Sequence, residues 1–170
     1  MPKQILKWVA YLLIALSAAV IFNGLFVSGK GVHDAMEASS LKSDQLMIVT
    51  ADKKQHVFKI ELALTVDEQQ KGLMNREKIA DDYGMLFVYT RVQETSMWMK
   101  NTLIPLDMLF IDNNGKIVWI AENAKPFDER AISSHFPVRA TLEIKGGQVA
   151  ARGIKLGDTV FNSYFGNTDK

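Results

Sequence analysis

Apolar and polar residues alternate over several short stretches in the middle of the chain. The clearest stretch is 56–64, in which Phe58, Ile60 and Leu62 alternate with polar residues. A period of two places these three side chains on one face of a strand. Similar apolar stretches predict further strands at residues 46–50, 84–89, 95–100, 107–112, 116–122, 140–145 and 159–161.

The spacing of these strands indicates the fold class. The strands follow one another about every ten residues with little helix between them, which is typical of antiparallel sandwiches and barrels. No alternation of strands with helices, the pattern of parallel βαβ units, is visible. We therefore expect a mainly β, antiparallel sandwich- or barrel-like domain with one or two short helices, preceded by an N-terminal membrane-directed helix.

Local signals predict one hairpin turn and two helix positions. Residues 113–115 read Asn-Asn-Gly, and Asn and Gly tolerate the positive φ that a tight hairpin needs. Thr65 is followed three residues later by Glu68, which is the spacing of a capping box at a helix start. We expect this helix to end near Gly72 with a left-handed cap. A second short helix is expected over 148–153.

The first 29 residues form an apolar segment directed to a membrane. No charged residue occurs between Trp8 and Gly29, and at 1.5 Å per residue a helix over 8–27 spans roughly 30 Å, the thickness of a hydrocarbon core. Lys3 and Lys7 precede it, which keeps the amino terminus in the cytoplasm by the positive-inside rule. The segment is either an uncleaved signal anchor, which the lack of a clean cleavage site favours, or a cleaved signal peptide. Both place the rest of the chain outside the cytoplasm.

The segment boundaries follow from these patterns. We expect a signal anchor or signal peptide over 1–29, a linker rich in small and charged residues over 30–44, the β domain over 45–162 and a fraying tail over 163–170. No internal repeat is visible. The domain is long enough to bury a core without disulfides or metals.

Charge and composition exclude several classes of function. The 170 residues carry a net charge of +1, and leaving out Lys3 and Lys7 changes this to −1 for the rest of the chain. A near-neutral domain without a basic block is a poor partner for nucleic acid. The absence of cysteine excludes disulfides, thiolate metal sites, Cys nucleophiles and a lipoprotein anchor. The three histidines are isolated, so we expect no metal site, and no motif predicts a cofactor.

The segment 96–112 carries the densest group of candidate binding residues. Polar side chains alternate there with Met, Trp, Leu and Ile, a combination typical of a small-ligand pocket. Asp107 begins an apolar strand, so its carboxylate needs a partner, which Lys100 or Arg76 provides in our interpretation. Trp98 is expected to be partly exposed beside Lys100 and Asn101, with its indole free to stack on a ligand. The candidate ligand-binding residues are Arg76, Trp98, Lys100, Asn101, Thr102 and Asp107.

Each of these residues also has a purely structural interpretation. Asn101 and Thr102 satisfy a turn in that reading, and Lys100 pairs with Asp107 inside the sheet. Arg76 either holds a ligand anion together with Glu68 or fixes a loop. No nucleophile elbow, metal motif or carboxylate pair stands out, so catalytic residues are not assigned and the question of enzymatic activity stays open.

Several motifs in order resemble the bacterial and archaeal family named domain of unknown function 192. They are Glu68-x-x-x-Gly72-Leu73-Met74-x-Arg76, Gly84-Met85-Leu86-Phe87, Trp98-Met99-Lys100-Asn101-Thr102-x-Ile104-Pro105-Leu106-Asp107, Phe110-Ile111-Asp112, Leu142-Glu143 and Gly153-Ile154-x-x-Gly157-Asp158. The resemblance covers residues 46–161. It implies a compact, mostly β domain, often behind a signal sequence, and it implies no reaction.

These observations predict an extracytoplasmic domain on the periplasmic side, tethered by the N-terminal helix or secreted. We expect a small-ligand-binding or accessory module of the cell envelope, whose partners are the membrane and an unknown small ligand or envelope protein. One alternative is an envelope hydrolase that uses Lys100 and Asp107 as an acid/base pair. Another is a structural partner of an envelope complex.

Overall fold

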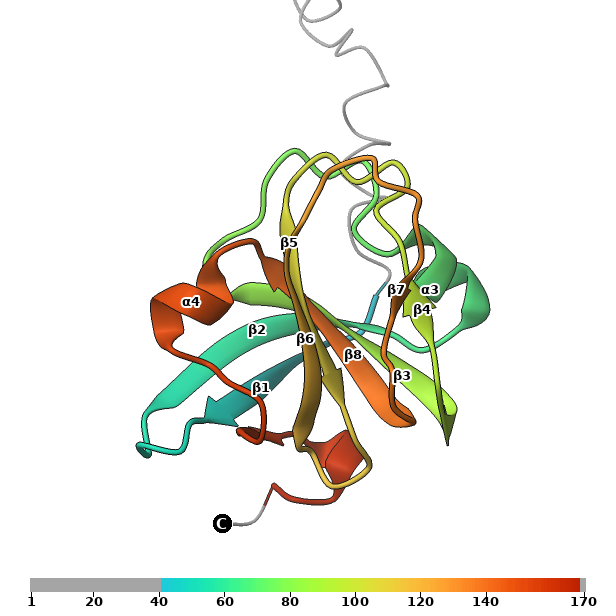
Figure 1. Ribbon diagram of the computed structural model, residues 1–170. Helices are drawn as coiled ribbons and strands as arrows, with labels where there is room; N and C mark the ends of the chain where they lie inside the picture. Colours follow the sequence, from blue (N-terminus) through green and yellow to red (C-terminus); the bar gives the residue numbers. More distant parts are fainter. Residues whose placement is uncertain (1–40, 169–170) are drawn as a thin grey trace, which may run out of the picture. The chain divides into compact units, whose positions relative to one another are not determined.

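The computed structural model describes residues 41–168, which form a domain built mainly of strands (Figure 1). The order of elements in these residues is β1 (Ser43–Val49), β2 (Gln55–Ala63), α3 (Val66–Lys71), β3 (Tyr83–Gln93), β4 (Ser96–Met97), β5 (Leu106–Ile111), β6 (Ile117–Ala124), β7 (Ile132–Ser133), β8 (Val138–Lys145), α4 (Gln148–Arg152), β9 (Thr159–Phe161) and the 3₁₀ turn η1 (Ser163–Phe165). The expectation of a mainly β domain with two short helices is confirmed.

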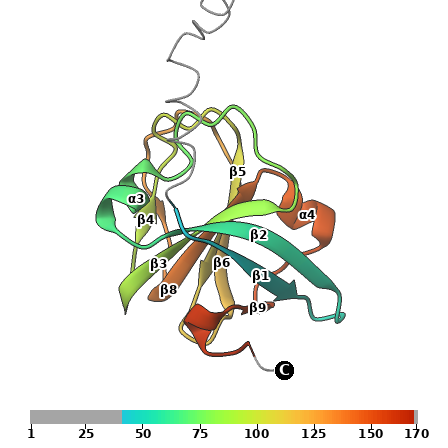
Figure 2. The same ribbon diagram turned by 180° about the vertical axis from the view of Figure 1, so that it is seen from behind.

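Seven of these strands form one curled sheet, a half-barrel seen from both sides in Figures 1 and 2. The strand order is β6-β5-β8-β3-β2-β1-β9. The two edges meet at one end of the sheet, where Lys116 and Thr159 form an isolated antiparallel bridge. Val160 N–H also donates to the carbonyl of Gly115 at 2.7 Å. The curl therefore nearly closes, and few ladder groups at this end are left open.

One pair of neighbouring strands is parallel, which the sequence analysis did not expect. β2 pairs with β3 in parallel, whereas the other pairs within the described residues are antiparallel. The connection between them contains α3, so the unit is a single βαβ crossover. Its helix has six residues, followed by turns as far as the start of β3. The capping box predicted this helix, but a helix of six residues does not by itself indicate that the strands on either side of it are parallel.

The two faces of the sheet bury two separate clusters of apolar side chains. The inner cluster includes Leu86 of β3, Leu142 of β8 and Leu109 of β5, and it is completed by Val149 of α4 and Phe165 of η1. Phe165 lies within the segment expected as a tail, and it packs on this core. The outer cluster takes the alternate residues of the same strands, among them Met85, Phe87, Tyr89, Met108 and Phe110. The outer cluster is covered by the segment after α3, which contributes Leu73, by loops and by the small β4–β7 sheet.

Several predicted elements differ in detail from the structure. The strand expected over 95–100 is wrong: β4 ends at Met97, and a turn follows over the next residues. It pairs only with β7, a two-residue strand that the sequence analysis missed. A strand this short has no measurable period, and Asn101 at φ 52° interrupts any extended backbone.

The hairpin turn and the capping box are confirmed, but the predicted left-handed cap at Gly72 is wrong. β5 and β6 form an antiparallel hairpin around residues 112–116, with Gly115 at φ 80°. Thr65 and Glu68 form the capping box at the start of α3. Gly72 ends this helix at φ 47° and ψ −135°, so its φ is positive but its conformation is not the left-handed helical one we expected. The second helix, α4, occupies 148–152.

The predicted membrane-directed helix over 1–29 lies outside the described residues. Within residues 41–168, no helix is long and apolar enough to span a membrane.

Candidate functional site

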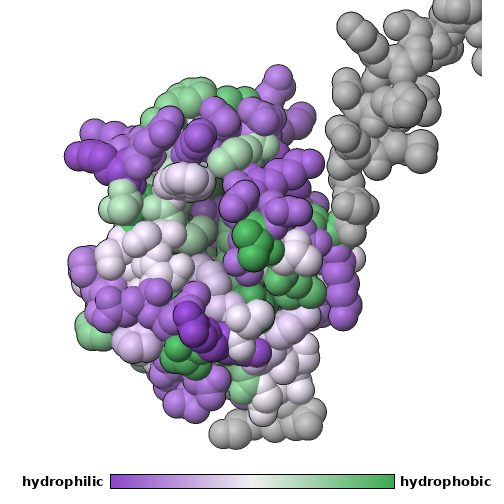
Figure 3. All heavy atoms as spheres, turned by 90° about the vertical axis from the view of Figure 1, so that its right-hand side faces the viewer, coloured by the Kyte–Doolittle hydropathy of each residue, from purple (hydrophilic) through white to green (hydrophobic). Residues whose placement is uncertain are grey.

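A pocket of about 200 Å³ opens on the outer face of the sheet, between α3 and β4. Its walls come from α3 and the residues after it, from Phe87 and Tyr89 of β3, from residues 95–98, and from Thr102. Glu143 of β8 lines it as well. Figure 3 views the side of the domain that carries α3 and β4, where pale and green side chains gather in the middle of a purple rim. The pocket therefore presents polar and apolar surface in similar proportions.

Hydrogen bonds to the sheet hold α3 beside this pocket. The Gln69 side-chain amide donates to the carbonyl of Val88 at 2.9 Å and to that of Ala63 at 3.2 Å. The helix thus attaches to both strands of the parallel pair. Gly72 follows it directly, and a Cβ there would lie 3.1 Å from the ring of Phe87. Close approach of the chain to that ring, together with a positive φ, requires glycine.

Glu143 is a buried acid without a hydrogen-bonding partner. It is 4% exposed, and among residues 41–168 no group donates a hydrogen bond to its carboxyl. Its neighbours on the same face are Met85 of β3 and Met108 of β5, directly opposite in the ladders. Burial without a compensating donor raises the pKa of Glu143 to about 8. The group is therefore mainly a neutral carboxylic acid at pH 7.

Tyr89 forms the next polar contact on this face. Its hydroxyl and that of Thr141 are 2.9 Å apart, and it donates to the sulfur of Met97 at 3.5 Å. Burial raises the pKa of Tyr89 above its usual value of 10.0. These contacts tie β3 to β8 and β4 at the pocket wall, so the phenol is held in one orientation.

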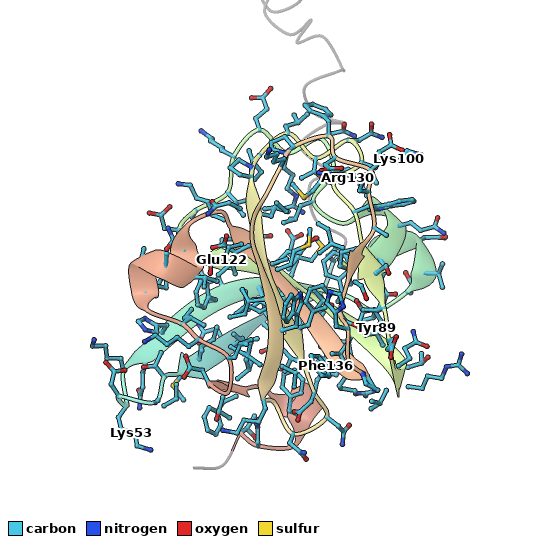
Figure 4. All side chains as sticks on the ribbon, viewed as in Figure 1. Lys53, Tyr89, Lys100, Glu122, Arg130 and Phe136 are labelled. Carbon is cyan, nitrogen blue, oxygen red and sulfur yellow. The ribbon has the colours of Figure 1, made fainter. Side chains whose placement is uncertain are left out.

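Trp98 lies at the pocket with much of its indole exposed, as the sequence analysis predicted. It is 44% exposed and lines the pocket. The Lys100 ammonium is 5.5 Å from the centre of the indole ring, a cation–π distance. Figure 4 labels Lys100 at the loop end of the domain and Tyr89 well below it. Because Trp98 is partly exposed and also lines the pocket, its indole offers a flat apolar surface to both solvent and the pocket.

Thr102 and Asn101 belong to the turn that follows Trp98. Thr102 is buried at the pocket, and its hydroxyl donates to the carbonyl of Lys100 at 3.3 Å. Asn101 adopts φ 52°, and its carbonyl accepts the N–H of Asn75, itself at φ 61°, at 2.9 Å. Two asparagines in the left-handed region thus join the turn after α3 to the turn after β4. This contact holds together two segments of the pocket wall.

The predicted pairing of Lys100 with Asp107 is wrong. Asp107 is completely buried, and its two carboxylate oxygens accept the backbone N–H groups of Asn123 and Val149, each at 2.8 Å. The second of these groups belongs to the first turn of α4, so Asp107 attaches that helix to the sheet. Lys100 lies instead against Trp98. The hydrolase alternative, which needs the two side chains together, therefore loses its acid/base pair.

The predicted pairing of Arg76 with Glu68 is also wrong. Both Leu64 N–H and Thr65 N–H donate to the Glu68 carboxylate at 2.8 Å, so Glu68 is used at the start of α3. The Arg76 guanidinium forms an ion pair with Glu61 of β2 and donates to the hydroxyl of Tyr83 at 3.1 Å. Arg76 therefore fixes the loop after α3 to the sheet.

The structure thus brings together two of the six candidate residues, Trp98 and Thr102, at one pocket. Lys100 lies at its edge through the indole contact, whereas Arg76, Asn101 and Asp107 do not line it. Glu143 was not among the predicted ligand-binding residues, although the Leu142-Glu143 motif includes it. An acidic residue between Leu142 and Ile144 in an otherwise apolar strand was the available signal. Within residues 41–168, no three His, Asp or Glu side chains are grouped to hold a metal ion.

Comparisons with known proteins give a family and a fold. The model of DUF192, described as "Uncharacterized ACR", matches residues 47–161. A solved structure from Sinorhizobium meliloti, described as a "putative transcription regulator", is 39% identical with a TM-score of 0.73, covering 74% of this chain and 98% of that one. A solved structure of a protein of unknown function from Novosphingobium aromaticivorans is 40% identical with a TM-score of 0.71, and the match covers 74% of this chain and 89% of that one. No curated protein matches the chain.

Proposed function

Since the chain belongs to the DUF192 family, we propose that its function is carried by the pocket between α3 and β4. The domain is a small-ligand-binding module of the cell envelope. Glu143 and Trp98 are its principal contacts, with Thr102 as a third polar group. The domain lies outside the cytoplasm, behind the apolar segment 8–29 that follows Lys3 and Lys7.

The observation that carries this proposal is the acid of Glu143, which is 4% exposed, faces the pocket and receives no hydrogen bond from residues 41–168. A buried polar group that forms no hydrogen bond costs free energy, on the order of 1–3 kcal/mol. Buried polar groups in folded proteins nearly always have a partner, and exceptions call for an explanation. Glu143 lines a pocket, so a bound molecule is the natural source of the missing hydrogen bond. A hydrogen bond to the ligand would then offset, in the free energy of binding, the penalty that the unpaired acid imposes on folding stability.

The exposed indole of Trp98 is a second observation in favour of the same function. A large aromatic side chain that is 44% exposed buries only part of its apolar surface in the folded domain. Its position at the mouth of the same pocket makes this surface available to a ligand. An apolar face beside one buried polar group is the usual composition of a small-molecule site.

The charge of the domain favours a small molecule over a polyanion. Residues after Lys7 carry a net charge of −1, and the pocket contains an acid. A phosphate backbone would meet little attraction there. The word "regulator" in the description of the Sinorhizobium meliloti protein is compatible with a ligand-responsive role, and we propose no nucleic-acid contact from it.

A thermal-melting screen of the purified full-length protein tests this proposal. The screen uses envelope sugars, short peptides, amines and metal ions, with wild type, Glu143→Gln and Trp98→Ala in parallel. Glu122→Gln serves as the matched control because this glutamate is exposed on β6, outside the pocket. We expect at least one compound to raise the melting temperature of wild type and the control but not of the two pocket variants. If every stabilising compound acts equally on all four proteins, the pocket is not the binding site.

A further inference from the structure

The contents of the pocket indicate the chemical class of its ligand. We infer that the pocket binds a small organic cation, with its ammonium group at the Glu143 carboxylate and its carbon skeleton against Trp98. This inference rests on the proposed function and specifies it. A primary ammonium group supplies both the missing charge and an N–H donor, whereas a quaternary ammonium supplies the charge alone.

The first step concerns which partner Glu143 lacks. Another acid of the outer face, Glu61, forms an ion pair with Arg76, whereas no basic side chain of residues 41–168 forms an ion pair with Glu143. The ladder neighbours of Glu143 on β3 and β5 are Met85 and Met108, which carry no charge. A cationic ligand supplies the missing charge and converts a desolvated acid into a paired carboxylate. A neutral hydrogen-bonding ligand removes only part of the same penalty.

The second step concerns the aromatic walls of the pocket. Phe87, Tyr89 and Trp98 all line it, and an aromatic face attracts a cation because its π electrons are negative. The indole already has a cation at its face in this structure, since the Lys100 ammonium is 5.5 Å from the ring centre. Aromatic walls combined with a carboxylate are the usual means of recognising an ammonium group.

The other charged and titratable groups of the pocket do not oppose this assignment. Lys71 of α3 is the only basic side chain among the lining residues, and it is exposed to solvent. Its ammonium group can stay in solvent, away from a bound cation. Lys100, at the edge of the pocket, contacts the Trp98 ring, so the ligand's carbon skeleton would pack on the indole surface that Lys100 leaves open. Tyr89 of β3 is neutral near pH 7 because burial raises its pKa above 10.0. Within the described part of the chain, Glu143 is therefore the one acid that lines the pocket.

The size of the pocket sets the size of the cation. A cavity of about 150 Å³ holds a benzene molecule in a well-studied case, and this pocket measures about 200 Å³. A group of six to eight non-hydrogen atoms is accordingly about the largest that fits inside, by comparison with that case. Choline and benzylammonium lie in this range, and butylammonium is slightly smaller.

The test compares these three cations with neutral molecules of the same shape. The neutral molecules are 3,3-dimethylbutan-1-ol, butanol and benzyl alcohol. Binding to the full-length protein is measured by calorimetry at pH 8. We expect the cations to bind more tightly than the alcohols. Glu143→Gln should lose about tenfold to a hundredfold in affinity for the two primary ammonium ions, the range for a charge-assisted hydrogen bond, and less for choline, whose nitrogen donates none. Trp98→Ala should weaken cation binding severalfold, and Glu122→Gln should leave it unchanged.

The pH dependence gives a second, independent outcome. Choline keeps its charge at all pH values, so any change in its affinity reports on the protein. Because the pKa of Glu143 is about 8, a cation must displace its proton below that pH. Choline affinity should therefore rise with pH up to about pH 8, by at most about tenfold per unit. The affinity of a neutral ligand that accepts a hydrogen bond from the protonated acid is instead constant below about pH 8 and falls above it.

The possible results separate this inference from the proposed function. Alcohols that bind as well as the cations, through Glu143, overturn the cationic ligand and leave the pocket as the site. Cation binding that persists in Glu143→Gln places the cation elsewhere and overturns the inference. Failure of all three cations to bind also overturns it, while the broader screen decides separately whether the pocket binds anything.

Discussion

Glu61 and Glu143 lie on opposite sides of Met85 in one row across the sheet. The ladder places Glu61 of β2 opposite Met85 of β3, and Met85 opposite Glu143 of β8. The two acids therefore share the outer face, about 10 Å apart from the spacing of strands. Glu61 is bonded to Arg76, whereas Glu143 is not bonded to any described residue. One acid stabilises the domain, and the other is available to a ligand.

The first prediction concerns the stability of the domain as a function of pH. The pKa of Glu143 rises from 4.5 to about 8 on folding, so the folded state binds the proton more tightly than the unfolded state. Its contribution to stability is complete below pH 4.5 and is lost as pH rises towards 8. Relative to Glu143→Gln, the wild-type free energy of unfolding should fall by about 1.4 kcal/mol per pH unit in this window. Urea unfolding of both proteins at a series of pH values measures this difference in unfolding free energy.

The control for this experiment is Glu122→Gln, which removes an exposed acid. Its unfolding free energy should follow that of wild type at every pH. Parallel curves for wild type and Glu143→Gln would show that Glu143 ionises normally in the folded state.

The second prediction concerns Asp107. Asp107→Ala leaves the N–H groups of Asn123 and Val149 without an acceptor, which should lower the free energy of unfolding by about 3–5 kcal/mol. Asp107→Asn keeps one acceptor oxygen and should lose less. Lys100→Ala should lower the free energy of unfolding by less than about 1 kcal/mol, because the Lys100 ammonium contacts the indole and forms no ion pair with any of residues 41–168.

A double-mutant cycle checks the same assignment. Since Lys100 and Asp107 do not touch, the losses from the two alanine substitutions should add within about 0.5 kcal/mol. A coupling clearly larger than this would restore the ion pair that we expected from the sequence.

The third prediction concerns the ion pair between Arg76 and Glu61. Arg76→Ala leaves a nearly buried carboxylate unpaired and should cost about 2–3 kcal/mol of unfolding free energy, less than a fully buried pair because Arg76 is partly exposed. The double variant Arg76→Ala with Glu61→Gln should recover part of this loss. Chemical denaturation of the three proteins measures it, and a double variant less stable than Arg76→Ala would argue against the pair.

The fourth prediction uses two glycines with nearly the same backbone conformation. Gly115 and Gly157 have φ values of 80° and 87°. A Cβ at Gly115 would lie 2.3 Å from the carbonyl oxygen of Val160, whereas a Cβ at Gly157 would meet nothing within 4 Å. Gly157→Ala should therefore cost only the strain of positive φ, about 1–2 kcal/mol. Gly115→Ala should cost about 1–3 kcal/mol more, since it also separates the two edges of the sheet.

Thermal or chemical unfolding of these two variants provides the comparison. Equal losses would mean that the contact between the 112–116 turn and β9 contributes little to the stability of the domain.

Signals confined to a few neighbouring residues were correctly interpreted from the sequence. Thr65 and Glu68 cap α3, and the Asn-Asn-Gly turn joins β5 to β6, because each motif satisfies its own backbone groups locally. The alternation in 56–64 predicted β2 for the same reason. The two-residue strands β4 and β7 escaped prediction because their pairing depends on a segment more than thirty residues away.

The candidate site was found only in part for a related reason. The motif around Trp98 marked the right segment, and its exposed indole was predicted from residue type. The partners of charged groups were not predictable, because proximity in sequence suggested Lys100 for Asp107 and Glu68 for Arg76. The real partners are backbone groups of β6 and α4 and an acid of β2.

The sequence by itself determined the strand composition, the hairpin turn, the helix cap and the family of this protein, since these depend on local patterns and on motifs in order. Only the tertiary structure decided that Glu143 lies unpaired in a pocket with Trp98 and Tyr89. That outcome depends on the strand order β5-β8-β3-β2, which places residues distant in sequence beside one another. Strand order is set by the burial of both faces of the whole sheet, and no short stretch of residues contains that information.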